Sequence, residues 1–159
     1  MRIVRTFKRC IETIIVMFFM MIAVVNFFSA PSSQGVFGYK GYTVISASME
    51  PTLKIGDYIL TAVEPFSQVK NGEIISFLDS GMIVTHRVVS IADDVATTRG
   101  DNNKIDDLKV VTAENYVGSF VLRIPYLGYL FIWLQNPLIF AIVMGIIALR
   151  LIILVVLKK

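Results

Sequence analysis

The 159-residue sequence contains only one cysteine and one histidine, and only 17% of its residues are charged. A lone cysteine, Cys10, cannot form an intrachain disulfide, and no Cys/His cluster has the spacing of a metal site. We therefore expect no disulfide framework, no metal and no cofactor. The hydrophobic fraction of 55% is high for a soluble protein, and it predicts membrane segments.

The formal net charge of +3 does not come from the middle of the chain. Residues 30–125 contain eight Lys and Arg against eleven Asp and Glu, a net charge of −3. The positive charge is therefore concentrated near the two ends, as membrane topology requires, and it does not form a nucleic-acid-binding face. No nucleic-acid partner is expected.

Two hydrophobic runs lie towards the ends of the chain. Residues 14–25 are all hydrophobic, and with their flanks (10–28) they approach the ~20 residues that span a bilayer. A cleavable signal peptide is the competing interpretation, but its hydrophobic region usually has only about 7–15 residues. The second run, 137–157, starts with a proline, which suits the first position of a helix. The segment before it, 127–136, is aromatic and is typical of a membrane interface.

The Lys and Arg residues also predict an orientation. The basic tails, 1–9 and 158–159, are expected in the cytoplasm, which places residues 29–126 on the far side of the cell membrane. The sequence thus predicts a two-pass protein of the cell membrane, with both termini cytoplasmic and one extracytoplasmic domain.

The middle of the chain is predicted to be mainly β, a compact all-β domain between two transmembrane helices. Its short segments are rich in Val, Ile, Tyr and Phe, and Gly, Asp, Asn and Ser separate them. The expected strands are 57–64, 72–78, 81–92, 94–100 and 115–126.

The single histidine, His86, lies in the strand-like segment MIVTHRVVSI. Alternation puts it on one face with Val84 and Val88, and puts Thr85 and Arg87 on the other. A histidine on an apolar face is either a core residue with a hydrogen-bond partner or a catalytic base. In both cases a partner is expected, because an unpaired polar ring costs about 1–3 kcal/mol.

The acidic candidates gather in RGDNNKIDD, residues 99–107. One interpretation is a turn rich in Asp and Asn. A calcium loop is rejected, because Ile105 and Asp106 occupy positions that need an oxygen ligand and a glycine. The third interpretation is a carboxylate that orients the imidazole of His86.

A third element is SASMEPT, residues 46–52, which is either a simple connection or a loop that holds a nucleophile. A serine hydroxyl attacks a carbonyl well only when a base removes its proton. An imidazole does so near neutral pH, and a carboxylate fixes the tautomer of that imidazole. Ser48, His86 and an aspartate of 99–107 form such a set, although their order in the chain matches none of the familiar hydrolases.

Together these motifs resemble the type I signal peptidases of the endoplasmic-reticulum kind, a branch also found in archaea and some Gram-positive bacteria. SASMEPTLKIGDYIL resembles the family's serine motif, IVTHRVV the segment in which histidine replaces a lysine base, and RGDNNKIDD the third motif. The resemblance covers roughly residues 40–125. The second membrane segment departs from the single anchor of many members and suggests a two-anchor subset.

The resemblance implies roles for named residues. Ser48 resembles the nucleophile and His86 the general base, and the triad aspartate falls best on Asp107, with Asp106 as the near alternative. Asp101 resembles a second required, supporting acid. Ser46 matches the position whose hydroxyl helps to bind the oxyanion in the lysine-dependent relatives.

The implied function is removal of signal peptides from exported preproteins, by cleavage after small residues at the membrane surface. The implied partners are preprotein signal peptides emerging from the translocon and the lipid bilayer, and accessory subunits are left open. Two alternatives remain, a catalytically inactive β domain that serves secretion or envelope assembly, and a serine protease with another target.

Overall fold

The computed structural model describes residues 10–14, 16–18, 20–21, 29–30 and 32–156. Its main element is one sheet of six strands, which confirms the prediction of a mainly β domain. The strands are β1 (Tyr39–Thr43), β2 (Tyr58–Ala62), β3 (Ile74–Asp79), β4 (Met82–Ala92), β5 (Val95–Arg99) and β6 (Tyr116–Ile124), with a short 3-10 helix, η1, at Phe66–Gln68. Five strands coincide with the predicted segments, whereas β1 was not predicted.

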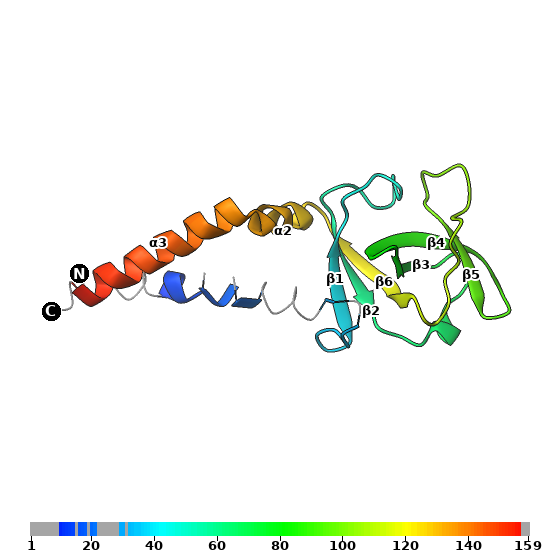
Figure 1. Ribbon diagram of the computed structural model, residues 1–159, viewed down its shortest axis with the longest axis horizontal. Coiled ribbons are helices and arrows are strands. Elements are labelled where there is room, and N and C mark those ends of the chain that lie inside the picture. Colours follow the sequence, from blue (N-terminus) through cyan, green and yellow to red (C-terminus); the bar gives the residue numbers. More distant parts are fainter. Residues whose placement is uncertain (1–9, 15, 19, 22–28, 31, 157–159) are drawn as a thin grey trace.

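The sheet is antiparallel throughout, in the order β1-β2-β6-β3-β4-β5 (Figure 1). Tight turns with positive φ at both central residues, Ser80–Gly81 and Asp93–Asp94, connect β3 to β4 and β4 to β5. Such turns match the right-handed twist of the strands that they join. They make three successive strands neighbours in the sheet.

The long strand β4 pairs differently along its two halves. Residues 82–87 pair with β3, but only residues from Arg87 onward pair with β5 on the other side. Among the strands that the structure describes, the second edge of β4 is therefore open at residues 82–86. An open edge offers backbone N–H and C=O groups to another extended chain.

The two faces of the sheet carry separate apolar clusters. Ile75, Phe77 and Val88 belong to one cluster, and Ile59 and Ile74 to the other. Adjacent residues of β3 join different clusters because successive side chains point to opposite faces of a sheet. The second cluster also includes Met49 and Leu53, from the loop between β1 and β2. Burial of these two side chains fixes that loop against the sheet.

The chain leaves the sheet through two helices, α2 (Leu127–Gln135) and α3 (Pro137–Val156). Phe131 of α2 stacks on Tyr58 of β2, with ring centroids 4.3 Å apart. Figure 1 shows α3 extending away from the sheet. A salt bridge of 2.9 Å joins Arg150 of α3 to Glu12, which lies in the described helical stretch 10–14.

Among the residues that the structure describes, no helix has both the length and the apolar character needed to cross a bilayer. The predicted spans, 10–28 and 137–157, both include residues outside the described part of the chain. The two spans therefore stay predictions. The basic tails 1–9 and 158–159 also lie outside the described residues.

Candidate active site

Ser48 lies on the loop between β1 and β2, and it is half-buried. Two backbone hydrogen bonds, from Val44 N to Asp57 O and from Gly56 N to Val44 O, close the base of this loop at 2.9 Å each. The next residue, Met49, is 2% exposed and packs into the core. The loop is thus held at its base and at its middle, so the serine hydroxyl has a fixed position.

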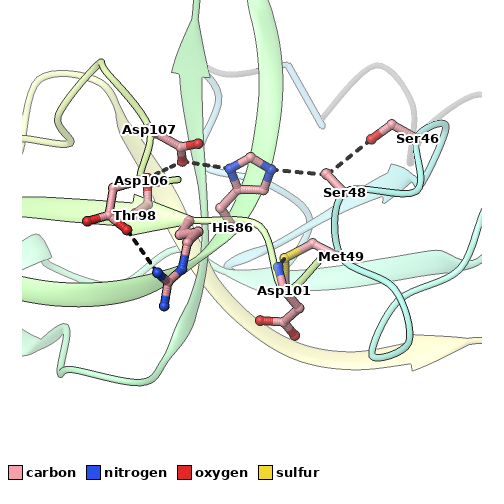
Figure 2. Close-up of polar contacts among 9 residues, drawn as sticks. Ser46, Ser48, Met49, His86, Thr98, Asp101, Asp106 and Asp107 are labelled. Carbon is pink, nitrogen blue, oxygen red and sulfur yellow. Dashed lines mark hydrogen bonds and ion pairs between the residues drawn. The ribbon is translucent and has the colours of Figure 1, made fainter. Parts of the chain in front are cut away.

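His86 connects this serine to an aspartate. Its Nε2 atom lies 3.0 Å from Ser48 Oγ, and its Nδ1 atom lies 2.6 Å from Asp107 Oδ2 (Figure 2). A carboxylate can only accept a hydrogen bond, so Nδ1 carries the proton and the lone pair of Nε2 faces the serine hydroxyl. In its neutral form this histidine, 7% exposed, therefore has the geometry that a general base requires.

The three acidic candidates lie in three different environments. Asp107 contacts His86, whereas Asp106 forms an ion pair of 3.4 Å with Arg99 in which both side chains are nearly half exposed. Of the two adjacent aspartates, Asp107 is the one that contacts His86, and its backbone is fixed because Asp107 N donates to Thr98 O at 2.8 Å. This bond brings the carboxylate of residue 107 towards β4.

The third acid, Asp101, binds the neighbour of the histidine. Arg87 Nε and Nη2 donate to Asp101 Oδ1 and Oδ2 at 2.8 and 2.7 Å, a bidentate pair on the other face of β4. The guanidinium holds the pKa of the Asp101 carboxyl below its usual range, and the carboxylate raises the pKa of Arg87 in turn. Thr52 also donates to Asp101. This acid therefore links residues 99–107, which we call the acidic loop, to residues 44–57, the serine loop that carries Ser48.

Ser46 lies at the entrance to the site. Its Oγ atom is 3.2 Å from Ser48 Oγ, and its side chain is exposed (Figure 2). Both hydroxyls line a cleft of about 530 Å³ that is walled by residues 42–46 on one side and residues 82–86 on the other. Its remaining lining is Met49, Leu53 and Ile59. The cleft therefore combines apolar walls with hydroxyl and imidazole groups at one point.

A profile of the family described as "Signal peptidase, peptidase S26" matches residues 7–120, more than half of the chain. The chain belongs to this signal peptidase family. Signal peptidase I W of Bacillus subtilis is 32% identical over 114 residues, which cover 68% of this chain and 57% of that protein. The signal peptidase complex catalytic subunit SEC11 of Chaetomium globosum is 31% identical over 121 residues, which cover 67% of this chain and 70% of that protein. The chain thus spans a little over half of the bacterial relative.

Several residues that contact this candidate site were not identified from the sequence. Gly100 is one, because a Cβ atom there would lie 2.5 Å from the carbonyl oxygen of Ser48. Two residues further on, Asn102 N donates to the same oxygen at 2.8 Å. Arg87 is another, and its position directly after the histidine, on the opposite face of the strand, was the available signal. The acidic loop and the serine loop are therefore in direct backbone contact.

No three His, Cys, Asp or Glu side chains group as metal ligands within the described part of the chain. The polar side chains that line the cleft carry hydroxyl groups and the imidazole of His86.

Proposed function

We propose that this protein is a membrane-bound serine endopeptidase that removes N-terminal signal peptides from exported preproteins. Ser48 is the nucleophile, His86 the general base, and Asp107 the acid that orients the imidazole. The observation that carries the proposal is the continuous chain of contacts from Ser48 Oγ through His86 to Asp107, at 3.0 and 2.6 Å. Family membership supports the same reaction and substrate class.

The reaction takes two steps at one serine. Ser48 Oγ attacks the carbonyl carbon of the scissile peptide while His86 Nε2 takes the hydroxyl proton, and Asp107 stabilises the imidazolium. The tetrahedral intermediate then collapses, the C–N bond breaks, and His86 gives its proton to the leaving amine. Water, deprotonated by His86, hydrolyses the ester and restores the serine.

The negative oxygen of the tetrahedral intermediate needs hydrogen-bond donors. Loss of one such donor typically costs ~10²–10³ in kcat. We assign one donor to the Ser46 hydroxyl, which lies beside the nucleophile at 3.2 Å, and the other to the backbone N–H of Ser48. Ser46→Ala is expected to lower kcat and leave KM nearly unchanged.

The cleft suits an extended peptide. The open edge of β4 at residues 82–86 supplies backbone hydrogen bonds, and the opposite wall at 42–46 encloses the chain. In an extended peptide, side chains two residues apart point the same way, so the first and third residues before the cut enter the same side of the cleft. Apolar walls of limited volume favour small side chains at these positions.

The membrane is the second part of the proposal. Segments 10–28 and 137–157 anchor the protein in the cell membrane, with both tails cytoplasmic and residues 29–126 extracytoplasmic. A tethered peptidase meets a tethered substrate at a high effective concentration. The catalytic-subunit name of the SEC11 relatives also suggests accessory subunits as partners.

The experiment is precursor cleavage by the full chain in proteoliposomes. Wild type is expected to cut a signal-peptide-bearing precursor after a small-x-small site, and Ser48→Ala and His86→Ala to lose cleavage while keeping the fold. Wild-type activity in His86→Ala would overturn the catalytic assignment. A silent wild type, with an intact fold and a competent precursor, would instead favour the catalytically inactive β domain.

A further inference from the structure

A buried threonine lies directly behind the aspartate of the active site. Thr98 belongs to β5 and is completely buried. It pairs with Val88 of β4, and Val88 lies two residues from His86, so all three side chains are on the same face of the sheet. Thr98 is thus a close neighbour of the imidazole, although it is distant from it in sequence.

Thr98 contacts Asp107 through both its side chain and its backbone. Its hydroxyl donates to Asp107 Oδ2 at 2.7 Å, and its carbonyl oxygen accepts from Asp107 N at 2.8 Å (Figure 2). The segment after Asp107 continues alongside β5, where Ala96 and Val111 exchange two backbone hydrogen bonds of 2.8 Å. Residue 107 is therefore held in register with residue 98.

The hydroxyl reaches the same oxygen that faces the histidine. Asp107 Oδ2 accepts from Thr98 Oγ1 at 2.7 Å and lies 2.6 Å from His86 Nδ1. A carboxylate on a free side chain rotates readily, because its terminal torsion is broad. A second donor on this one oxygen removes that freedom and leaves Oδ2 aimed at Nδ1.

We propose that Thr98 is a positioning residue, which fixes the Asp107 carboxylate and through it the Nδ1–H tautomer of His86. The proposal rests on the proposed peptidase function for its catalytic consequence, but the tautomer itself is a property of the folded protein. Thr98 is not among the residues that line the cleft, and its hydroxyl bonds to Asp107. It acts only through Asp107.

The single histidine makes a direct test available. Nitrogen-15 NMR of the full chain in detergent gives one imidazole, whose two nitrogen shifts report the tautomer when the ring is neutral. Wild type and Thr98→Ser are expected to show the Nδ1–H form, because both keep a hydroxyl. Thr98→Val, equal in size but without the donor, is expected to show a mixture of tautomers.

Thr97→Val is the matched control, since the neighbouring residue of β5 points to the opposite face. It should leave the imidazole shifts unchanged, and a backbone amide spectrum should show the sheet intact in every variant. A pure Nδ1–H tautomer in folded Thr98→Val would overturn the proposal. So would a loss of that tautomer in Thr98→Ser, which keeps the hydroxyl.

Cleavage kinetics test the catalytic consequence. Thr98→Val should lower kcat about tenfold with KM unchanged, because small misplacements of a catalytic group cost up to ~10²-fold, and Thr98→Ser should restore most of the activity. In an Asp107→Asn background, Thr98→Val should change kcat less than about twofold, since the residue it positions is already disabled. A tenfold loss in both backgrounds would indicate a merely structural role and overturn the proposal.

The NMR and cleavage experiments test the proposed function and the role of Thr98 separately. If the wild type fails to cleave precursors, the proposed function fails, and the tautomer measurement still decides whether Thr98 positions Asp107. If the wild type cleaves and Thr98→Val keeps its kcat and its tautomer, only the inference about Thr98 fails.

Discussion

On each face of β4 one residue pairs with an aspartate, and the two pairs differ in kind. His86 and Arg87 are adjacent, point to opposite faces, and each meets an aspartate from the same loop, at 2.6 Å for Asp107 and 2.7 Å for Asp101. A guanidinium is always charged and binds a carboxylate with two parallel bonds, so the Arg87 pair persists wherever Asp101 is ionised. An imidazole gains and loses a proton near neutral pH, so the His86 pair suits proton transfer. One face anchors the loop, and the other holds the pair that we propose for proton transfer.

The largest effect is expected from breaking the pair on the histidine face. Asp107→Asn should lower kcat by ~10³–10⁴, because the amide can donate to Nδ1 and stabilise the wrong tautomer. The measurement is single-turnover cleavage of a precursor in proteoliposomes.

Asp106→Asn is the matched control for this variant. It removes the neighbouring carboxylate and an exposed ion pair with Arg99, which contributes about 0–1 kcal/mol. Its kcat should stay within about twofold of wild type. If Asp106→Asn were the inactive variant and Asp107→Asn the active one, the assignment of the triad acid would be wrong.

A substitution at Gly100 should disturb the residue pairs on both faces of β4 at once, because Gly100 is where the acidic loop contacts the serine loop. Gly100→Ala places a Cβ atom 2.5 Å from Ser48 O, and overpacking of this kind costs about 1–3 kcal/mol. The displaced serine should lower kcat by up to ~10²-fold. Thermal unfolding and cleavage assays measure the two effects.

Gly145→Ala in α3 controls for the added methyl group, since a Cβ atom there has no atom of the described residues within 4 Å. It should leave cleavage unchanged. Full activity and stability in Gly100→Ala would contradict the close contact between the two loops.

Breaking the Arg87–Asp101 pair is expected to have a smaller effect, which acts mainly on stability and only indirectly on cleavage. Asp101→Asn should lower the free energy of unfolding by about 1–3 kcal/mol, because the Arg87 guanidinium loses its charged partner. The loss of activity should follow the loss of folded protein. Asp94→Asn, at an exposed turn, should change the same free energy by less than about 0.5 kcal/mol. A folded, fully stable but inactive Asp101→Asn would instead give this acid a direct part in the reaction.

The smallest predicted effect is a pH dependence of the stability that the Arg87–Asp101 pair contributes. The pKa of Asp101 is lower in the folded state than in the unfolded chain. The contribution of Asp101 to the free energy of unfolding is therefore complete above the pKa of the unfolded chain, about 3.9, and is lost as the pH falls through the pKa of the folded protein. The difference in unfolding free energy between wild type and Asp101→Asn should therefore be constant near neutral pH and shrink below about pH 4. Denaturant titrations at several pH values measure it, and a difference that grows in acid would contradict the sign of the shift.

Much of the domain could be predicted from local sequence. Five strands follow from runs of Val, Ile, Tyr and Phe, and His86 was singled out because it is the only histidine. β1 was missed because its sequence, YKGYT, is short and is interrupted by Lys and Gly, which are depleted in strands, and it is defined by pairing with β2. Its Gly41 is needed because the Tyr58 hydroxyl occupies the space of a Cβ atom there.

The pairing of acids with bases could not be predicted from local sequence, because it depends on the path of the loop, and the preference for Asp107 came only from the family resemblance. Asp106 and Asp107 are chemically identical, and only the register with Thr98 decides which one faces β4. Arg87 and Asp101 likewise meet only because the loop turns at Gly100 towards the other face. Alternation along β5 would have placed Thr98 on the buried face. Its hydrogen-bond partner, Asp107, lies beyond the turn at Gly100, so this contact could not be predicted.

The separation of the three site residues along the chain has a consequence for the order of biosynthesis. Ser48 is made first, His86 follows 38 residues later, and Asp107 another 21 residues after that. A growing chain that ends in β5 holds a serine and a histidine but lacks the aspartate that contacts the imidazole. The proposed peptidase activity would therefore be among the last properties that the newly made domain acquires, after most of its strands are complete.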